Sequence, residues 1–302
     1  MNTGSIPNST GFHNTRDNKG KFTKAPRTKA TKKQKLPDFI WNKLEYPSVE
    51  EITMRLTAIY ASETYKKLTA KKPLKPYLKG DPNNVLIIGD THAPFTREGY
   101  LEFCREQQER YNCGTVVHIG DEVDNCAMSF HEKDPDGDSA ATEATKAQIE
   151  MNKWYALFPT VSVCIGNHTE LAFRQAKASG VAKRFLKPYE EAWCAPKGWK
   201  WATEFEYNGV LYTHGTGTSG DKAAINKALN MRQSVVQGHI HTIASINYNV
   251  SPKDILFGMQ VGCGIDDKAY AFNYAKSNIK KSIISCGVVI NGTQPILIPM
   301  PI

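Results

Sequence analysis

Residues 84–92 have the sequence NVLIIGDTH, a short apolar run that ends in glycine and is followed by polar side chains. Two later stretches have the same form, TVVHIGDEVD at 115–124 and VSVCIGNH at 161–168. A continuous apolar run of this length is typical of a strand that is buried on both faces of a sheet. Helical patterns near 97–110 and 139–157 separate the runs, so the order β-α-β-α-β predicts a layered α/β domain.

Each of these runs places a potential metal ligand directly after its glycine. Glycine lets the backbone turn sharply, and in α/β sheets functional side chains gather in the crevice at the carboxyl ends of the strands. Two further segments, YTHG at 212–215 and GHIH at 238–241, add three imidazoles. The candidate ligands are Asp90, His92, Asp121, Asn167, His214, His239 and His241.

The chemistry of this donor set indicates which cations it would hold. Carboxylate, amide oxygen and imidazole together suit manganese, iron or zinc, whereas an all-oxygen set would suggest magnesium or calcium. The set is larger than one cation needs. We therefore expect two divalent cations, with manganese as the first choice. A single histidine or Gly-Asp pair would be explained as a structural residue or a turn, but the coincidence of all five segments would not.

In this order the segments D-x-H, G-D-x-x-D, G-N-H, an isolated H-G and G-H-x-H resemble the calcineurin-like metallophosphoesterase superfamily, over roughly residues 84–265. The resemblance implies a layered α/β/β/α sandwich. It also implies two ligand sets that share a bridging Asp121. One set would be Asp90, His92, Asp121 and His241. The other would be Asp121, Asn167, His214 and His239.

The same resemblance implies a hydrolase that acts on phosphate esters. Two cations about 3.5–4 Å apart can activate a shared hydroxide and neutralise the phosphoryl oxygens. His168 would stabilise the transition state or protonate the leaving oxygen without binding metal. Asp124 would hold the ligands in place by hydrogen bonding.

Departures from the family pattern narrow the substrate. The Ser/Thr protein phosphatase branch has an arginine that binds phosphate at the position of Asn125. That branch also has a glutamate directly after the histidine of the third motif, where this chain has Thr169 followed by Glu170. The intact GHIH at 238–241 is similar to the phosphodiesterase and DNA-repair nuclease branches. The first hypothesis is therefore a phosphodiesterase or nuclease. The alternatives are a phosphomonoesterase acting on nucleotides or phosphoproteins, and a nucleic-acid-binding module with a vestigial metal site.

The net charge of +8 is concentrated at the start of the chain. Residues 1–36 contain nine basic residues and the single acid Asp17, whereas 37–302 contain equal numbers of both. This polar, glycine- and lysine-rich arm is predicted to be disordered and to attract nucleic acid. Residues 37–83 are predicted to form a helical segment, with its helix near 48–68, and a linker. The catalytic domain would then span 84–302.

Seven cysteines without a C-x-x-C pair favour a reduced, cytoplasmic setting. No apolar run reaches the length of a membrane span, so no membrane partner is expected. A small phosphoesterase with a basic arm would suit a bacterial or phage setting. The oligomeric state is left open.

Other features have structural interpretations. His118 lies inside a predicted strand and is expected in the core, while His13 and His131 lie in polar segments. Trp199 and Trp201 could stack on bases. Their period-two register with two later aromatics favours one buried strand face made of Trp199, Trp201, Phe205 and Tyr207.

Three further segments resemble known phosphate- or calcium-binding patterns. Arg174, Lys183 and Arg184 are expected on one helix, either as a phosphate grip or, more commonly, as a solvated face. Residues 215–220 are expected to form a flexible rim, with a helix starting at Asp221. The Asp134–Asp138 segment lacks the last glutamate of a calcium loop and is expected to be a solvated loop.

Overall fold

The computed structural model of the protein describes residues 74–130, 137–266, 268 and 281–301. The chain divides into two compact units, Met1–Lys71 and Lys72–Ile302, and the described residues all belong to the second. The predicted basic arm and the predicted helix near 48–68 lie outside the described residues, as do His13 and His131. Within the described part of the chain, no helix is long and apolar enough to cross a membrane.

Strands and helices alternate in the first half of this unit, as the apolar runs predict. The elements are β1 (Asp81–Ile88), α3 (Tyr100–Arg110), β2 (Cys113–His118), the 3-10 helix η1 (Cys126–Met128), α4 (Ala140–Leu157) and β3 (Thr160–Cys164). They are followed by α5 (Leu171–Ala178), the 3-10 helix η2 (Lys183–Phe185), α6 (Tyr189–Ala192) and β4 (Gly198–Ala202).

Strands dominate the second half. The elements are β5 (Glu204–Tyr207), β6 (Val210–Thr213), α7 (Ala223–Met231), β7 (Ser234–Gln237), β8 (Ser245–Val250), β9 (Ile255–Gln260), β10 (Ser285–Ile290) and β11 (Gln294–Pro299). A turn at Asn208-Gly209 joins β5 to β6 as an antiparallel hairpin, with Tyr207 opposite Val210. Both turn residues have positive φ, which asparagine and glycine tolerate best.

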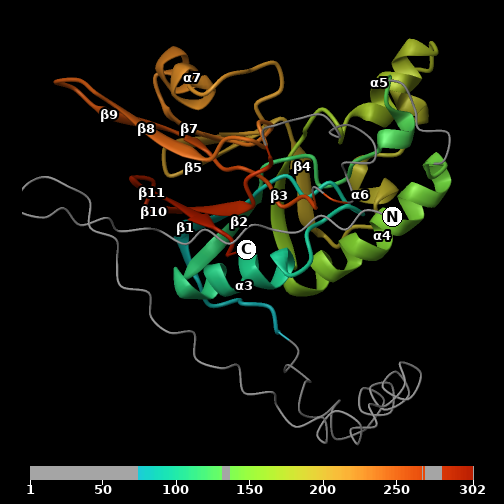
Figure 1. The fold of residues 1–302 in the computed structure, drawn as a ribbon, viewed down its shortest axis with the longest axis horizontal. Helices are drawn as coiled ribbons and strands as arrows, with labels where there is room; N and C mark the ends of the chain where they lie inside the picture. The colour runs from blue at the N-terminus through green and yellow to red at the C-terminus, as the bar shows by residue number, and fades with distance from the viewer. Residues whose placement is uncertain (1–73, 131–136, 267, 269–280, 302) are drawn as a thin grey trace, which may run out of the picture. The chain divides into compact units, whose positions relative to one another are not determined.

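The strands form two sheets. A six-stranded sheet has the order β11-β10-β1-β2-β3-β4, and a five-stranded sheet has the order β5-β6-β7-β9-β8. Strands β1 to β4 pair in parallel in the first sheet, and β6, β7 and β9 do so in the second. In Figure 1 the helices α3 and α4 cover the outer face of the six-stranded sheet, and α7 lies over the five-stranded sheet. The predicted α/β/β/α sandwich is confirmed.

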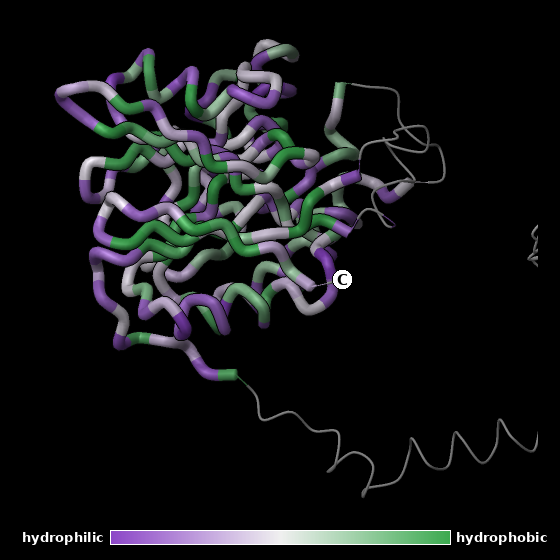
Figure 2. The backbone as a smooth tube through the Cα atoms, turned by 60° about the vertical axis from the view of Figure 1, so that its left-hand side comes forward, coloured by the Kyte–Doolittle hydropathy of each residue, from purple (hydrophilic) through white to green (hydrophobic). Residues whose placement is uncertain are grey.

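The apolar core lies in the layers between these elements. Leu86 and Ile88 of β1 pack in the layer under α3 and α4, whereas Val85 and Ile87 face the second sheet. This alternation confirms that β1 is buried on both faces. Figure 2 shows the hydrophobic strand segments running through the middle of the fold. The strand ends are thereby held rigidly where the polar loops begin.

The prediction of a single aromatic strand face was wrong. Trp199 and Trp201 belong to β4 of the six-stranded sheet, whereas Phe205 and Tyr207 belong to β5 of the other sheet. The chain changes sheets at Thr203, between the two strands. Period-two spacing continued across this crossing, so the sequence pattern could not distinguish one long strand from two short ones.

Two helix predictions also needed correction. Arg174 lies on α5, but Lys183 and Arg184 lie on the separate 3-10 helix η2. Helix α5 ends at Ala178, and the turn that follows it contains Gly180, which has a positive φ. The helix expected at Asp221 begins at Ala223 instead.

Candidate metal centre

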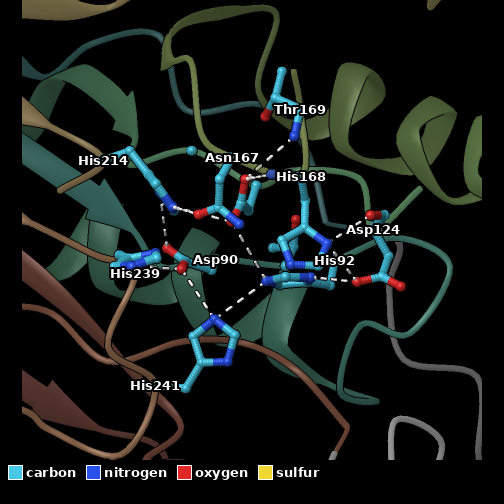
Figure 3. Close-up of polar contacts among 12 residues, drawn as sticks. Asp90, His92, Asp124, Asn167, His168, Thr169, His214, His239 and His241 are labelled. Atoms are coloured by element: carbon cyan, nitrogen blue, oxygen red, sulfur yellow. Dashed lines mark hydrogen bonds and ion pairs between the residues drawn. The ribbon is translucent and has the colours of Figure 1, made fainter. Parts of the chain in front are cut away.

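The candidate ligands follow strands of both sheets. Asp90 and His92 come after β1, and Asp121 comes after β2. Asn167 follows β3, while His214 follows β6 and the GHIH segment follows β7. Because these strands are parallel neighbours within each sheet, their carboxyl ends meet at one edge of the sandwich. The structure therefore brings the seven predicted ligands together in one centre. Figure 3 labels six of them, namely Asp90, His92, Asn167, His214, His239 and His241.

Asp90, His92 and His241 form the first donor group. One ligand atom from each lies within 4.8 Å of the others. His241 Nε2 is 3.1 Å from Asp90 Oδ2 and 3.2 Å from His92 Nε2. Asp90 and His92 are fully buried, and Asp90 Oδ1 has no hydrogen-bond partner among the described residues.

Asp121, His214 and His239 form the second donor group, again with ligand atoms within 4.8 Å of one another. His214 Nε2 lies 3.0 Å from Asp121 Oδ2 and 3.0 Å from Asn167 Oδ1. The two groups meet at Asp121, since its Oδ2 is also 3.9 Å from His92 Nε2.

The loop after β3 is fixed to Asp121 through its backbone. The amide N–H groups of His168 and Thr169 donate to Asp121 Oδ1, at 2.8 and 3.2 Å. Gly166 comes so close to this carboxylate that a Cβ there would collide with it. One oxygen of Asp121 is therefore used to position the loop, and the other faces the histidines.

Asp124 lies between two histidines. Its Oδ1 accepts a hydrogen bond of 2.6 Å from His92 Nδ1 and lies 3.2 Å from His168 Nδ1. Its backbone carbonyl accepts a second bond of 2.7 Å from His168 Nδ1. Asp124 thus orients both rings, and the Nε2 atom of each ring is left for the centre.

The backbone at the centre is held in unusual conformations. His92, Asp121 and His239 have φ values of 47°, 48° and 70°, in the left-handed region that favours glycine. Gly120 has a φ of 113°, and a Cβ there would lie 2.6 Å from His214 Nδ1. Such strain persists only where the surrounding structure over-determines it, and it clusters at functional sites.

Burial and close charges set the protonation of these groups. Burial disfavours the Asp121 carboxylate, but the charge and hydrogen bond of His214, together with the charges of His168 and His92, outweigh burial and hold the pKa of Asp121 well below its ordinary value. For His214 burial likewise opposes the charge, yet Asp121 and Asp90 raise its pKa to about 9. Burial lowers the pKa of His92 and of His239, so both rings are neutral near pH 7.

His118 has a different environment from the candidate ligands. Its Nδ1 accepts from the Gly120 N–H at 3.3 Å and its Nε2 lies 3.0 Å from Thr91 Oγ1, which itself donates to a carbonyl. Both ring nitrogens are therefore used by a neutral imidazole. Burial lowers the pKa of His118 to about 4. The prediction of a core histidine is confirmed.

Glu122 is a buried charged residue near the centre that the sequence patterns did not single out. It accepts hydrogen bonds from Thr169 Oγ1 at 2.8 Å and from Trp201 Nε1 at 2.9 Å. Burial raises its pKa to about 7. The only local indication of its role in the sequence is its place in GDEVD, next to Asp121. Its partner Trp201 comes from a distant strand and could not be predicted from that motif. Glu122 ties β4 to the loop that carries His168.

The side chains fit divalent cations. His214 Nδ1 is 3.1 Å from the Ile119 carbonyl, so its N–H points there and Nε2 faces the oxygens of Asp121 and Asn167, where it can bind a proton or a cation. His92 likewise uses Nδ1–H for Asp124. Metal-binding histidines typically donate their second ring N–H to a carboxylate or a carbonyl in this way. Only a proton or a cation could stabilise so many facing lone pairs.

The layered fold and the strand-end donors together define an α/β protein with a candidate metal centre. The family model for calcineurin-like phosphoesterases matches residues 84–259, which is more than half of the chain. The chain belongs to the calcineurin-like phosphoesterase family. A comparison with curated proteins found no match.

Similar solved structures have low sequence identity. A single mutant of Vps29 from Entamoeba histolytica is 11% identical, with a TM-score of 0.35, and the alignment covers 72% of this chain and 99% of that one. The nuclease MPE from Pseudomonas putida is 11% identical, with a TM-score of 0.32 and coverage of 72% and 87%. Yfce, a phosphoesterase from E. coli, is 13% identical, with a TM-score of 0.34 and coverage of 71% and 99%.

Proposed function

We propose that the protein is a dinuclear metal-dependent phosphodiesterase whose substrate is nucleic acid. The observation that carries the proposal is the pair of donor groups that share Asp121, with His214 Nε2 3.0 Å and His92 Nε2 3.9 Å from the same carboxylate oxygen. One cation would be held by Asp90, His92, Asp121 and His241. The other would be held by Asp121, Asn167, His214 and His239.

Two divalent cations at such a centre would lower the pKa of water and neutralise charge on the phosphoryl oxygens. We propose manganese, iron or zinc, because the donors mix oxygen and imidazole nitrogen, and manganese is the cation to test first.

The chain's own residues supply the remaining chemistry. His168 donates through Nδ1 to the Asp124 carbonyl, so its ring is fixed and Nε2 has no hydrogen bond to the part of the chain that the structure describes. Burial opposes its charge, but Asp124 and Asp121 outweigh burial and raise the pKa of His168 to about 9. A protonated imidazole held this way can give its Nε2 proton to the leaving oxygen. Asp124 therefore acts by positioning His168 and His92.

The choice of a diester rests on what the centre lacks and on the chain's charge. Asn125 donates to the His168 carbonyl at 3.1 Å and so holds the His168 loop in place. Asparagine has no guanidinium group to bind the doubly charged phosphate of a monoester. The arm at 1–36, with its net charge of +8, would attract a polyanion. Both features favour a nucleic-acid diester over a nucleotide monoester or a phosphoprotein.

The test combines metal counting with turnover. We expect two Mn²⁺ per chain by calorimetry, and Mn²⁺-dependent hydrolysis of a chromogenic diester and of DNA, with little action on a monoester or a phosphopeptide. Asp121→Asn and His239→Ala should each lose a cation and nearly all turnover. His118→Gln replaces a buried imidazole outside the donor groups and should keep both cations.

Cleavage of monoesters alone would reject the diester proposal. The absence of any metal-dependent turnover, with DNA binding retained, would favour the nucleic-acid-binding module instead.

We also propose a reducing cytoplasm as the working compartment. All seven cysteines are free in the structure, and five of them are buried. Protein purified without reductant and then unfolded should titrate as seven thiols. A lower number would indicate disulfides and contradict this proposal.

A further inference from the structure

A dense cationic segment lies directly beside the candidate centre. Residues 171–189 contain five basic side chains and no acidic one, although 37–302 as a whole is balanced in charge. All five basic side chains are exposed. They are Arg174, Lys177, Lys183, Arg184 and Lys187. The segment 171–189 thus carries a charge of +5, with Glu170 directly before it and Glu190 and Glu191 directly after it.

Three of these cations line a pocket of about 470 Å³. They are Arg174, Lys177 and Lys183, and none of them forms an ion pair within the described part of the chain. Ile165 and Glu170 line the same pocket. These two residues bracket the loop that carries Asn167 and His168, so a chain leaving the centre over this loop would enter the pocket.

A second, apolar pocket lies on the other side of the same wall. It has a volume of about 530 Å³ and shares Phe173, Leu186 and Tyr189 with the basic pocket. Its lining also includes Asn125 and Thr169, which hold the His168 loop in place. A cationic pocket and an apolar pocket therefore flank one catalytic loop.

Aromatic side chains are interleaved with the cations. The Lys183 ammonium lies 5.3 Å from the Phe173 ring centroid, and the Arg184 guanidinium lies 5.8 Å from that of Phe185. Phe185 is 76% exposed, which is a large apolar area to leave in water. Cations that follow a backbone and aromatic rings that stack on bases are together the features of single-strand binding sites.

We infer that residues 171–189 bind single-stranded nucleic acid next to the scissile phosphate. The cations of the basic pocket contact backbone phosphates, and Phe185 stacks on an unpaired base. A paired base would not present its face to Phe185, so the ligand is a single strand and not a duplex. The location next to a scissile phosphate rests on the proposed function. The binding of a single strand does not.

The first experiment measures binding without turnover. A labelled oligothymidylate is titrated with the full chain in EDTA, by fluorescence anisotropy over a range of salt concentrations. The test variant is the triple substitution Arg174→Gln, Lys177→Gln, Lys183→Gln. The matched control removes the same charges from exposed positions elsewhere in the domain, namely Arg110→Gln, Lys222→Gln and Lys253→Gln.

The expected loss follows from counterion release. Each phosphate contact to a single strand contributes about 0.7 to the slope of log K against log salt, so the test variant should lose about 2 from that slope and bind about 100-fold more weakly at about 0.1 M salt. The control should keep the slope, because its cations would not touch the strand. Equal losses in the two triple variants would overturn the inference.

The second experiment tests the single-strand assignment. Phe185→Ala should weaken oligothymidylate binding about tenfold, as expected for one stacked base, and leave duplex binding unchanged. Tyr248→Ala, which removes another exposed aromatic ring, should change neither. Tighter binding of duplex than of single strand by the unmodified chain, or no effect of Phe185→Ala, would overturn the assignment.

Turnover separates this inference from the proposed function. If both are right, the triple variant keeps its kcat on a small chromogenic diester and shows a raised KM only on the oligonucleotide. If the unmodified chain hydrolyses no diester but the EDTA titrations give the expected losses, the proposed function fails and the binding surface stands. If diester turnover is normal and the titrations show no specific loss, the binding surface fails alone.

Discussion

The histidines near the centre differ in how their two ring nitrogens are used. His92 and His214 each direct Nδ1 to a protein oxygen, so that Nε2 points into the donor groups. His118 is equally buried, but both of its nitrogens are already bonded to the protein. The sequence distinguished these roles by position alone, because the ligands follow strands and His118 lies within one.

Replacing His168 by alanine should slow the chemical step without releasing metal. Loss of a general acid typically lowers the rate between a hundredfold and ten-thousandfold. We expect a fall in kcat of about a thousandfold on a diester with a poor leaving group, and a much smaller fall when the leaving group is a nitrophenolate that needs no proton. Elemental analysis should still find two cations.

The geometry also allows His168 to be a metal ligand. One ligand atom from each of His92, Asp124 and His168 also lies within 4.8 Å of the others. If His168→Ala lost a cation, His168 would be a ligand and its assignment as a proton donor would be wrong.

His118 should make the stability of the metal-free protein depend on pH. Its pKa is about 4 in the fold and near 6.5 when unfolded, so between these values only the unfolded chain binds the proton. Its contribution to stability is therefore complete above pH 6.5 and is lost as the pH falls toward 4.

The measurement is a pair of urea titrations in EDTA. From about pH 7 to about pH 5 the unmodified protein should lose about 2 kcal/mol more unfolding free energy than His118→Gln. The comparison cancels the opposite contributions of His168 and His214, whose pKa values are raised. Equal losses in both proteins would show that His118 accepts a proton in the fold.

At the level of elements, the strand ends could be predicted and the sheet crossing could not. Apolar runs ending in glycine placed β1, β2 and β3 correctly, because burial on both faces leaves a continuous signal. Trp199 to Tyr207 gave an equally regular pattern that turned out to span two sheets. Which sheet a short strand joins depends on contacts with distant strands, and these leave no local mark in the sequence.

The same limit explains why Glu122 was missed. Its charge is accommodated by Thr169 and Trp201, which lie 47 and 79 residues further along the chain. Nothing in the local motif shows that these partners converge. The ligand set could be found because each ligand carries its own strand-end motif, whereas a partner such as Trp201 carries none.

The turn after β3 should tolerate no side chain at its glycine. A methyl group at Gly166 would overlap the Asp121 carboxylate, which also accepts the His168 and Thr169 amides. Gly166→Ala should therefore displace the loop, cost about 1–3 kcal/mol of stability and weaken metal binding.

Thermal unfolding and a Mn²⁺ titration would measure both effects. Gly180→Ala is the control, because Gly180 has a left-handed φ of 74° with nothing within 4 Å. It should cost about 1 kcal/mol through backbone strain and leave metal binding unchanged. Normal metal binding by Gly166→Ala would show that the loop can shift without disturbing Asp121.

At the scale of the whole molecule, charge and catalysis are carried by different parts of the chain. The family match at 84–259 contains every candidate ligand, and residues 1–36 carry a charge equal to the whole net charge of +8. The order of motifs was enough to predict the α/β/β/α layers. The pockets beside α5 were not predictable, because their walls come from elements whose packing only the folded chain reveals.

Removing residues 1–36 should separate attraction from hydrolysis. A small diester carries too little charge to be attracted by the arm, so its kcat and KM should stay the same. Binding of single-stranded DNA should weaken, and the slope of log K against log salt should fall by up to about 6 for nine lost cations.

A full-length variant with those nine basic residues replaced by glutamine should behave like the truncation. If the truncation weakens binding and the glutamine variant does not, the arm acts through something other than its charge. If the truncation lowers turnover of the small diester, the arm contributes to the catalytic domain itself. The residual salt slope of the truncated protein should then disappear in the Arg174, Lys177 and Lys183 triple variant, because the folded cations are the remaining contacts to the strand.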